Sequence, residues 1–407
     1  MANSLVTIDM ITREALRVAH EKSQFIGTVD RQYDSSFTKT GAKIGTALRV
    51  RKPNQYTRTT GSRVMDVQDQ SEQNGTITVA TQDHVDMRFN SAELALSIDE
   101  ISMRYIEPAV SVLVSGIESD FLAYATKATY NVAGTAGTAI SSLVAPGAAR
   151  AKLNQCLAPK DGNRAIQMDS VTMGGLVNGV AAYFAPNGDI SKQFREGMVA
   201  RTAMADYYEN ERIWSLTNNA DIVCTMAAAA AVTDGGSVMT MASLSAAPAT
   251  GAVFTVPGIY SCHPETKASL GSLQQYVVTT GTTTIQTVSP AIYLTGPRQN
   301  VCSAAGAQLT TASYDGTALV PVFQGAASTT YAQPIMYHKE AFQFVTADLP
   351  IMDDAAKCVR RVQDGLSMRV WQASDIRNDE LLMRIDILYG MAALRPEWAC
   401  RMIGSAS

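Results

Sequence analysis

A long stretch in the second half of this chain is almost free of charge. Residues 218–328 hold only six charged side chains in 111 positions, whereas about one residue in five is charged elsewhere. Thr, Ser, Ala, Gly and Val dominate the stretch. Gly and Pro interrupt its short apolar runs, which is typical of β-strands joined by turns. The flanking sequence mixes helical and strand patterns. We therefore predict a β module inserted into an α+β host.

The whole-chain composition narrows the class of protein. With 407 residues, the chain is long enough for two or three domains. Its net charge of −4 gives no general attraction to nucleic acid, since phosphate binding needs clustered Lys and Arg. The six cysteines form no CxxC pair, which favours free, reduced thiols. We find no signal peptide and no apolar run near the roughly 20 residues of a membrane span, so we expect a soluble protein.

Two helices are predicted in the first third. Thr7 is placed to cap a helix that runs to about Lys22, either a core helix or an arm that packs on another subunit. The longest helical pattern covers residues 97–130, and Pro108 must kink it or begin its second half. Its predicted inner face is Ile98, Ile101, Tyr105, Ala109, Val112, Leu113, Gly116, Ile117, Phe121, Tyr124 and Ala128.

A long hairpin is predicted between these helices. Alternating apolar residues indicate a strand that ends at Lys52-Pro53, and Asn74-Gly75 is a turn signal before a return strand over 76–89. The polar residues between them contribute little to any core, so we expect the hairpin to lie on a partner. Its cations have too few aromatic neighbours for nucleic-acid binding, which favours a solvated face or a protein–protein contact. These candidate contact residues are Arg49, Arg51, Lys52, Arg58 and Arg63.

The remaining elements are shorter. Helices are predicted over 148–157, from a cap at Ser170, and over 190–200 after a cap at Asp189. Strands are predicted over 165–168, 335–338, 342–347 and 383–388.

No catalytic or metal-binding pattern stands out. The chain lacks G-x-S-x-G, G-x-x-x-x-G-K, H-E-x-x-H and G-x-G-x-x-G, and its four histidines have no carboxylate or cysteine at catalytic spacing. Cys262-His263 with Cys302 offers three zinc ligands, but packed thiols and a turn histidine are the simpler interpretation. Adjacent carboxylates such as Asp353-Asp354 point to opposite faces of a strand. We predict no enzyme activity, no metal and no cofactor.

The order of these parts resembles the major capsid (coat) proteins of tailed bacteriophages with the HK97-like fold, and in particular the P22-like coat branch. The segments that carry the resemblance run in order along nearly the whole chain: 45–53 (GTALRVRKP), 190–197 (ISKQFREG), 251–260 (GAVFTVPGIY), 264–267 (PETK), 273–278 (LQQYVV) and 388–397 (LYGMAALRPE).

The resemblance implies an α+β, HK97-like subunit with an inserted small β-barrel-like domain. The implied regions are an N-terminal arm (1–40), an extended hairpin region (41–90), a peripheral domain with a spine helix (91–145), an axial domain (146–217), the inserted β domain (218–328), and an axial and peripheral return with a C-terminal strand (329–407). The implied function is self-assembly into hexamers and pentamers of an icosahedral shell that encloses phage double-stranded DNA.

The implied setting is the virion, after assembly in the host cytoplasm. The implied partners are separate scaffolding and portal proteins, with weak non-specific contact to packaged DNA and no membrane. Lys52 and Asn54 lie near the hairpin, but we assign no isopeptide cross-link to them. Two other functions stay open. A tail-tube or decoration protein is also β-rich but needs no thirty-residue spine. A carbohydrate-active β protein requires clustered aromatics or paired carboxylates.

Overall fold

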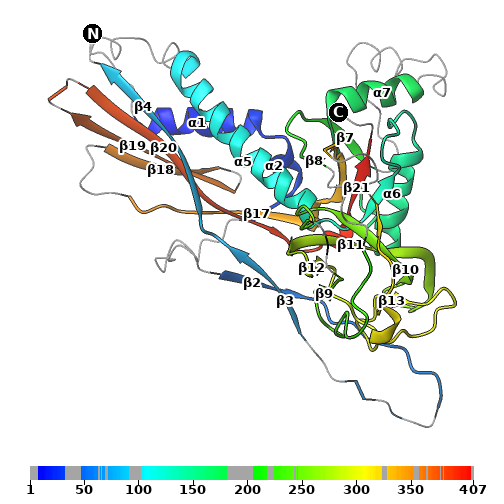
Figure 1. The fold of residues 1–407 in the computed structure, drawn as a ribbon. Coiled ribbons are helices and arrows are strands. Elements are labelled where there is room, and N and C mark those ends of the chain that lie inside the picture. Colours follow the sequence, from blue (N-terminus) through cyan, green and yellow to red (C-terminus); the bar gives the residue numbers. More distant parts are fainter. Residues whose placement is uncertain are drawn as a thin grey trace. The chain divides into compact units, whose positions relative to one another are not determined.

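The computed structural model describes residues 8–32, 47–62, 65, 67–68, 72–90, 102–180, 205–217, 224–242, 244, 246–322, 328–351, 357–363, 365–375, 377–378 and 380–404. These residues form an α+β protein with two compact units (Figure 1). The first unit consists of residues 1–50, 74–121 and 342–394, and the second of residues 51–73, 122–341 and 395–407. In the described part of the chain, no helix is both long and apolar enough to cross a membrane.

The first unit is built on a six-stranded sheet. Four strands follow one another in the order β1 (Asp30–Gln32), β17 (Phe342–Ala347), β20 (Glu380–Ala393) and β19 (Leu366–Asp375), with β18 (Lys357–Gln363) at the edge and β4 (Thr81–Asn90) paired to β20. All pairs are antiparallel except β1 with β17. The strands predicted over 342–347 and 383–388 are thus confirmed, although β20 is longer, and β18 and β19 were not predicted.

Helices cover one face of this sheet. Helix α1 (Ile8–Lys22) packs on β18 and β19, and a short helix, α2 (Phe25–Thr28), follows it. The apolar residues Ile11, Ala15, Val18 and Ala19, which recur at helical spacing, form the buried face of α1. Thr7 lies outside the described residues.

The spine helix begins later than its sequence pattern predicts. A π-helical turn, Ser102–Ile106, leads into α5 (Glu107–Ala128), so Pro108 stands at the start of the α-helix, where its missing N–H needs no partner. Residues 91–101 lie outside the described residues. The buried stripe includes Leu113, Ile117 and Phe121 as predicted. Val112 and Tyr124 were wrongly placed inside, since they are 67% and 40% exposed.

The hairpin consists of β2 (Ala47–Lys52) paired with β3 (Gln73–Thr78). The predicted turn at Asn74-Gly75 is wrong, because both residues lie inside β3. The predicted return strand is also split. Its second half is β4, which belongs to the sheet of the first unit.

The second unit contains a five-stranded sheet in the order β5 (Val132–Gly134), β21 (Ala399–Ile403), β16 (Ile335–His338), β6 (Arg164–Met168) and β7 (Asp206–Glu209). The strands predicted over 165–168 and 335–338 are confirmed. Helices α6 (Val144–Gln155) and α7 (Ser170–Val180) belong to the same unit. The cap of α7 was wrongly assigned to Ser170, because the Thr172 N–H donates to the Asp169 carboxylate at 3.0 Å. The helix predicted over 190–200 lies outside the described residues.

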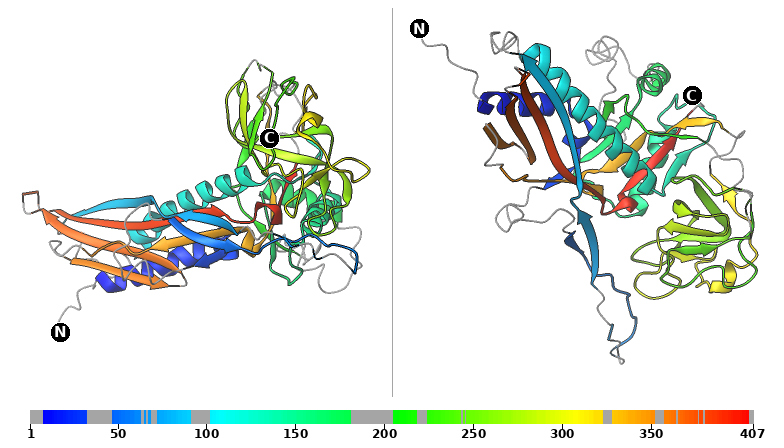
Figure 2. Two further views of the ribbon diagram at one scale, coloured as in Figure 1. Left: turned by 90° about the horizontal axis from the view of Figure 1, so that it is seen from below. Right: turned by 60° about the vertical axis from the view of Figure 1, so that its left-hand side comes forward.

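The described residues of the charge-poor stretch, which we call the β module, form a β-sheet of their own. Its sheet runs in the order β13 (Val301–Cys302), β10 (Val253–Cys262), β11 (Ser269–Gly281), β12 (Ile285–Ser289) and β9 (Val238–Thr240), with β14 (Val320–Pro321) also paired to β10. Both views in Figure 2 show its strands, green to yellow, gathered into one curved layer. A core that includes Phe254, Tyr276 and Tyr314 lies inside it. Before and after the module, β8 (Ser215–Thr217) pairs with β15 (Thr330–Ala332).

One face of the module is anchored inside the second unit. Val253 and Val277 pack with Tyr130 and Val132. The Gln275 side chain accepts the Val132 N–H at 2.8 Å and donates to the Val132 carbonyl at 3.1 Å. It thus satisfies both backbone groups of Val132, as the backbone of a paired strand would. An independent domain over 218–328 therefore stays a prediction.

Candidate functional site

The predicted contact cations lie on or beside the hairpin. Arg49 and Arg51 are exposed on one face of β2, and Lys52, on the other face, is half-buried. Arg58 is exposed in the segment that follows β2. Arg63 lies outside the described residues. The structure therefore places the four described cations along one arm of the hairpin rather than in one cluster.

Two contacts tie the arms of the hairpin together. The Arg51 guanidinium lies 3.7 Å from the Glu72 carboxylate, with both side chains largely exposed, so this pair contributes about 0–1 kcal/mol. The Gln68 amide accepts the Thr57 N–H at 2.9 Å and donates to the Thr57 carbonyl at 2.6 Å. One predicted contact residue, Arg51, is thus already paired within its own chain.

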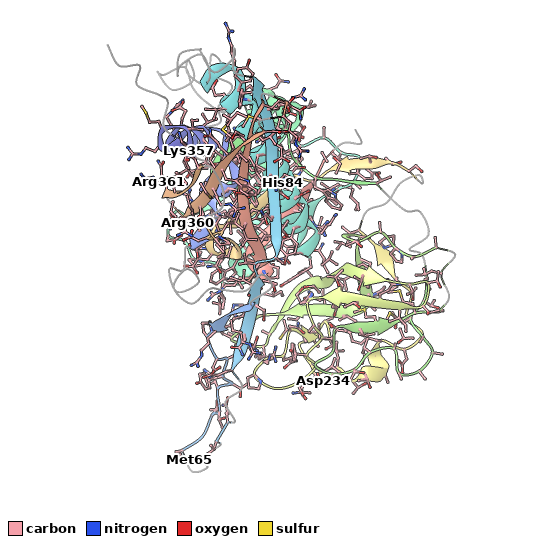
Figure 3. All side chains as sticks on the ribbon, turned by 90° about the vertical axis from the view of Figure 1, so that its left-hand side faces the viewer. Met65, His84, Asp234, Lys357, Arg360 and Arg361 are labelled. Atoms are coloured by element: carbon pink, nitrogen blue, oxygen red, sulfur yellow. The ribbon has the colours of Figure 1, made fainter. Side chains whose placement is uncertain are left out.

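Exposed apolar side chains accompany the cations, and sequence reasoning missed them. Tyr56, Met65 and Val67 are 55%, 89% and 76% exposed. Figure 3 shows Met65 at the far end of the hairpin. Single exposed apolar residues are ordinary, but three within twelve positions of a segment that lacks a core indicate a contact surface.

The structure brings together one histidine–carboxylate pair that the sequence concealed. His338 is buried, and its Nε2 lies 3.1 and 3.3 Å from the two Asp161 carboxylate oxygens, 177 positions away. Its Nδ1 accepts the Glu340 N–H at 3.3 Å. Both ring nitrogens are therefore engaged, and neither is available to activate a nucleophile. The pair holds β16 to the loop before β6 rather than performing catalysis.

The cysteine and histidine set is also structural. Cys262 and Cys302 are buried, and burial raises the pKa of the Cys262 thiol to about 12, which disfavours the thiolate that binds metal. The His263 Nδ1 accepts the N–H groups of Glu265 and Thr266 at 3.2 Å each. Among the described residues, no group of three or more His, Cys, Asp or Glu side chains is arranged to hold a metal ion. Asp353-Asp354 lies outside the described residues.

Comparison with known proteins gives one sequence match. Residues 217–404, which contain the β module and the return to β20 and β21, match the family model described as "P22 coat protein - gene protein 5". No curated protein matches the chain in sequence.

Three of the solved structures that resemble this chain come from phages. A structure titled "Mycobacterium phage Che8" has a TM-score of 0.47 at 11% identity and covers 95% of this chain and 92% of that chain. The capsid of cyanophage P-SCSP1u has a TM-score of 0.43 at 10% identity, covering 93% and 86%. The mature capsid of bacteriophage PhiM1 has a TM-score of 0.43 at 11% identity, covering 94% and 86%.

The family match covers just under half of the chain. Residues 217–404 therefore resemble the P22 coat protein family in sequence.

Proposed function

We propose that this chain is a tailed-phage major capsid protein with an HK97-like fold that forms the icosahedral shell of the virion, a function supported by the coat protein match of residues 217–404. We further propose that the hairpin is the element through which each subunit lies on its neighbour in that shell. The observation that carries this proposal is the segment between β2 and β3, where Tyr56, Met65 and Val67 are exposed. The Gln68–Thr57 and Arg51–Glu72 contacts join its arms. A surface of this kind gains stability when a neighbouring subunit covers it. Arg49, Arg51, Lys52, Arg58 and Arg63 supply charge pairing across the same contact.

Deleting residues 54–62 tests this function. The deletion removes no residue of β2 or β3, so the subunit remains a folded, soluble monomer that forms few shells. Circular dichroism follows the fold and electron microscopy counts closed particles. An unfolded monomer contradicts the proposal, because the segment then belongs to the subunit core. Normal shell yield also contradicts it.

A matched pair of point variants isolates the apolar contact. Met65→Ser and Val171→Ser each remove an apolar side chain that is more than 80% exposed, from the hairpin and from α7 respectively. Met65→Ser slows assembly, whereas Val171→Ser assembles at the wild-type rate. Equal assembly rates for the two variants argue against an apolar contact at the hairpin.

We further propose that residues 218–328 are the inserted domain of the P22-like branch, which supports subunit folding and contacts within a capsomer. Three features support this: its own aromatic core, its low charge and the family match that spans it. The other domain boundaries, 1–40, 41–90, 91–145, 146–217 and 329–407, belong to the same proposal.

We also propose separate scaffolding and portal proteins as partners, and double-stranded DNA as the enclosed cargo. The net charge of −4 supports a shell that encloses DNA without binding it tightly. Electron microscopy of the expressed protein tests the assembly type, since uniform closed shells support the capsid function and tubes favour a tail-tube protein.

A further inference from the structure

The second unit contains a large cavity that the shell function does not explain. Its volume is about 540 Å³, within the range of small-molecule sites. Its lining comes from α6, from β10 and the turn that follows it, and from segments 289–300 and 395–398, with hairpin residues 52–55 and 73 at one side.

The charged residues that line this cavity are unbalanced. The lining contains one carboxylate, Glu397, and five cations: Lys52, Lys152, Lys267, Arg298 and Arg395. The whole chain has 33 Lys and Arg against 37 Asp and Glu, so the excess is local. Lys267 and Arg298 are moreover the only two cations of the charge-poor stretch 218–328, and both line this one cavity.

Neighbouring groups hold the cations in place. The Arg298 guanidinium carbon lies 4.0 Å from the Tyr293 ring centroid, and that of Arg395 lies 4.1 Å from the Trp398 ring centroid. The Lys267 ammonium donates to the carbonyls of Pro297 and Gln299 at 2.5 and 3.2 Å, which fixes the segment that carries Arg298. Two guanidinium groups are therefore oriented in advance for an anion.

Ion pairs within the chain do not neutralise this excess. Among the described residues, none of the five cations forms an ion pair with a carboxylate. Burial lowers the pKa of Lys267. Burial also raises the pKa of Glu397, although the nearby charges of Lys52 and Arg395 act in the opposite direction. A ligand with several negative charges relieves this imbalance.

We propose that this cavity binds a small, multiply charged anion through its phosphate or carboxylate groups. Arg298 and Arg395 bind its oxygens as planar donors, and Lys152 and Lys52 add point charges. Lys52 is also one of the proposed hairpin contact residues, but anion binding is tested on the unassembled subunit, where no neighbour engages it. A solvated cleft whose cations merely attract counterions is the alternative.

Calorimetric titration of the unassembled full-length chain tests the proposal, with tripolyphosphate as the probe and citrate in a parallel titration. Sodium chloride keeps the ionic strength constant. We expect saturable, one-to-one binding. Tighter binding of tripolyphosphate identifies phosphate as the preferred group, and tighter binding of citrate identifies carboxylate. Absence of binding to both anions overturns the proposal.

Three variants locate the site. Arg298→Gln and Lys152→Gln remove cations from two different elements, and each weakens binding by about tenfold or more, because each removes a charge-assisted contact. Lys160→Gln removes an exposed cation that does not line the cavity and leaves binding unchanged. Equal losses in all three variants show non-specific attraction and overturn the proposal, as does wild-type binding by both cavity variants.

Discussion

Glu118 offers the sharpest test of how this subunit holds its N-terminal helices. Its side chain is fully buried in the middle of α5, and its Oε1 accepts the backbone N–H groups of Gln24, Phe25 and Ile26 at 2.6, 2.7 and 3.2 Å. These donors form the start of α2, which has no side-chain cap of its own. One carboxylate on the spine helix thus satisfies the N-terminus of a helix that is 92–94 positions away in sequence.

The cost of losing this carboxylate follows from the three donors. Hydrogen bonds to a charged group contribute about 1.5–3 kcal/mol each, and a buried N–H left without a partner costs about 1–3 kcal/mol. Since α2 can shift to admit water, we expect Glu118→Ala to lower the free energy of unfolding by about 3–5 kcal/mol. Glu118→Gln keeps an acceptor oxygen and loses only the charge, so its cost is smaller, about 1–2 kcal/mol.

Urea denaturation of the unassembled subunit, followed by circular dichroism, measures both changes. Asp120→Ala is the matched control, because it removes an exposed carboxylate from the same helix and costs less than about 0.5 kcal/mol. If Glu118→Ala is no more destabilising than Asp120→Ala, the three hydrogen bonds do not hold α2 and the reasoning is refuted.

Three further predictions concern charge. Burial raises the pKa of Asp161, but hydrogen bonds from Asn163 and His338 outweigh it and lower the pKa to about 2. The Asp161 carboxylate therefore stabilises the fold fully above the ordinary pKa of 3.8, and this stabilisation is lost as the pH falls towards 2. Urea titrations measure the free energy of unfolding at pH 5 and pH 2.5, and we expect it to fall less between these two values in Asp161→Asn than in wild type. Charge reversal at Arg58 slows shell assembly, which light scattering measures, and the effect becomes smaller as the salt concentration rises above about 0.1 M. If neither charge reversal nor salt changes the assembly rate, Arg58 is only solvated and makes no subunit contact. DNA binding by the purified subunit at physiological salt is barely detectable by fluorescence anisotropy, and tight or sequence-selective binding contradicts the container function.

Sequence patterns predicted the elements whose buried residues are mainly apolar. Helix α1 follows the helical repeat, and β6, β16 and β17 contain short apolar runs, so their positions were found correctly. Each of these elements also buries a polar residue: Thr12, Gln167, His338 and Gln343. The turn at Asn74-Gly75 failed because local turn propensity was outweighed by pairing with β2, which no local pattern records.

Buried charges concealed β19, and the neighbouring strand β18 was missed as well. Arg369 in β19 and Asp386 in β20 are 4% and 0% exposed, and the Arg369 Nε donates to the Asp386 carboxylate at 3.0 Å. Such a pair interrupts the apolar repeat although both residues lie in the core. The neighbouring edge strand β18 has four exposed residues, Lys357, Arg361, Val362 and Gln363, so its sequence lacks an apolar repeat as well.

The candidate site was predicted only in part. Arg49, Arg51 and Arg58 are exposed, as is usual for Arg, whereas Lys52 is half-buried. No local sequence pattern singles out Tyr56, Met65 and Val67 as a shared exposed surface. The His338–Asp161 pair joins residues 177 positions apart, a separation that no spacing rule covers.

Arg401 is a second residue whose burial its local sequence does not reveal. An arginine in a closing strand is expected on the surface, yet Arg401 in β21 is fully buried. Its Nε donates to the Thr129 carbonyl at 2.9 Å and its Nη1 to the Gly251 carbonyl at 2.8 Å. These two bonds link β21 to the residue that follows α5 and to the turn before β10. Burial lowers the pKa of Arg401 to about 9, so the charge is costly and the two carbonyls must offset that cost.

Replacing Arg401 by Met separates these two effects. The side chain is of similar length and apolar, so it removes the desolvation cost and leaves the two carbonyls without their donor, at about 1–3 kcal/mol each. We expect a net loss of about 1–3 kcal/mol in the free energy of unfolding by urea titration, since the recovered desolvation energy offsets part of the loss. Lys160→Met, on the exposed loop after α6, is the control and stays within about 0.5 kcal/mol of wild type. A variant more stable than wild type would mean that the desolvation cost exceeds both hydrogen bonds, and that Arg401 is not what holds the β module to the strand beneath it.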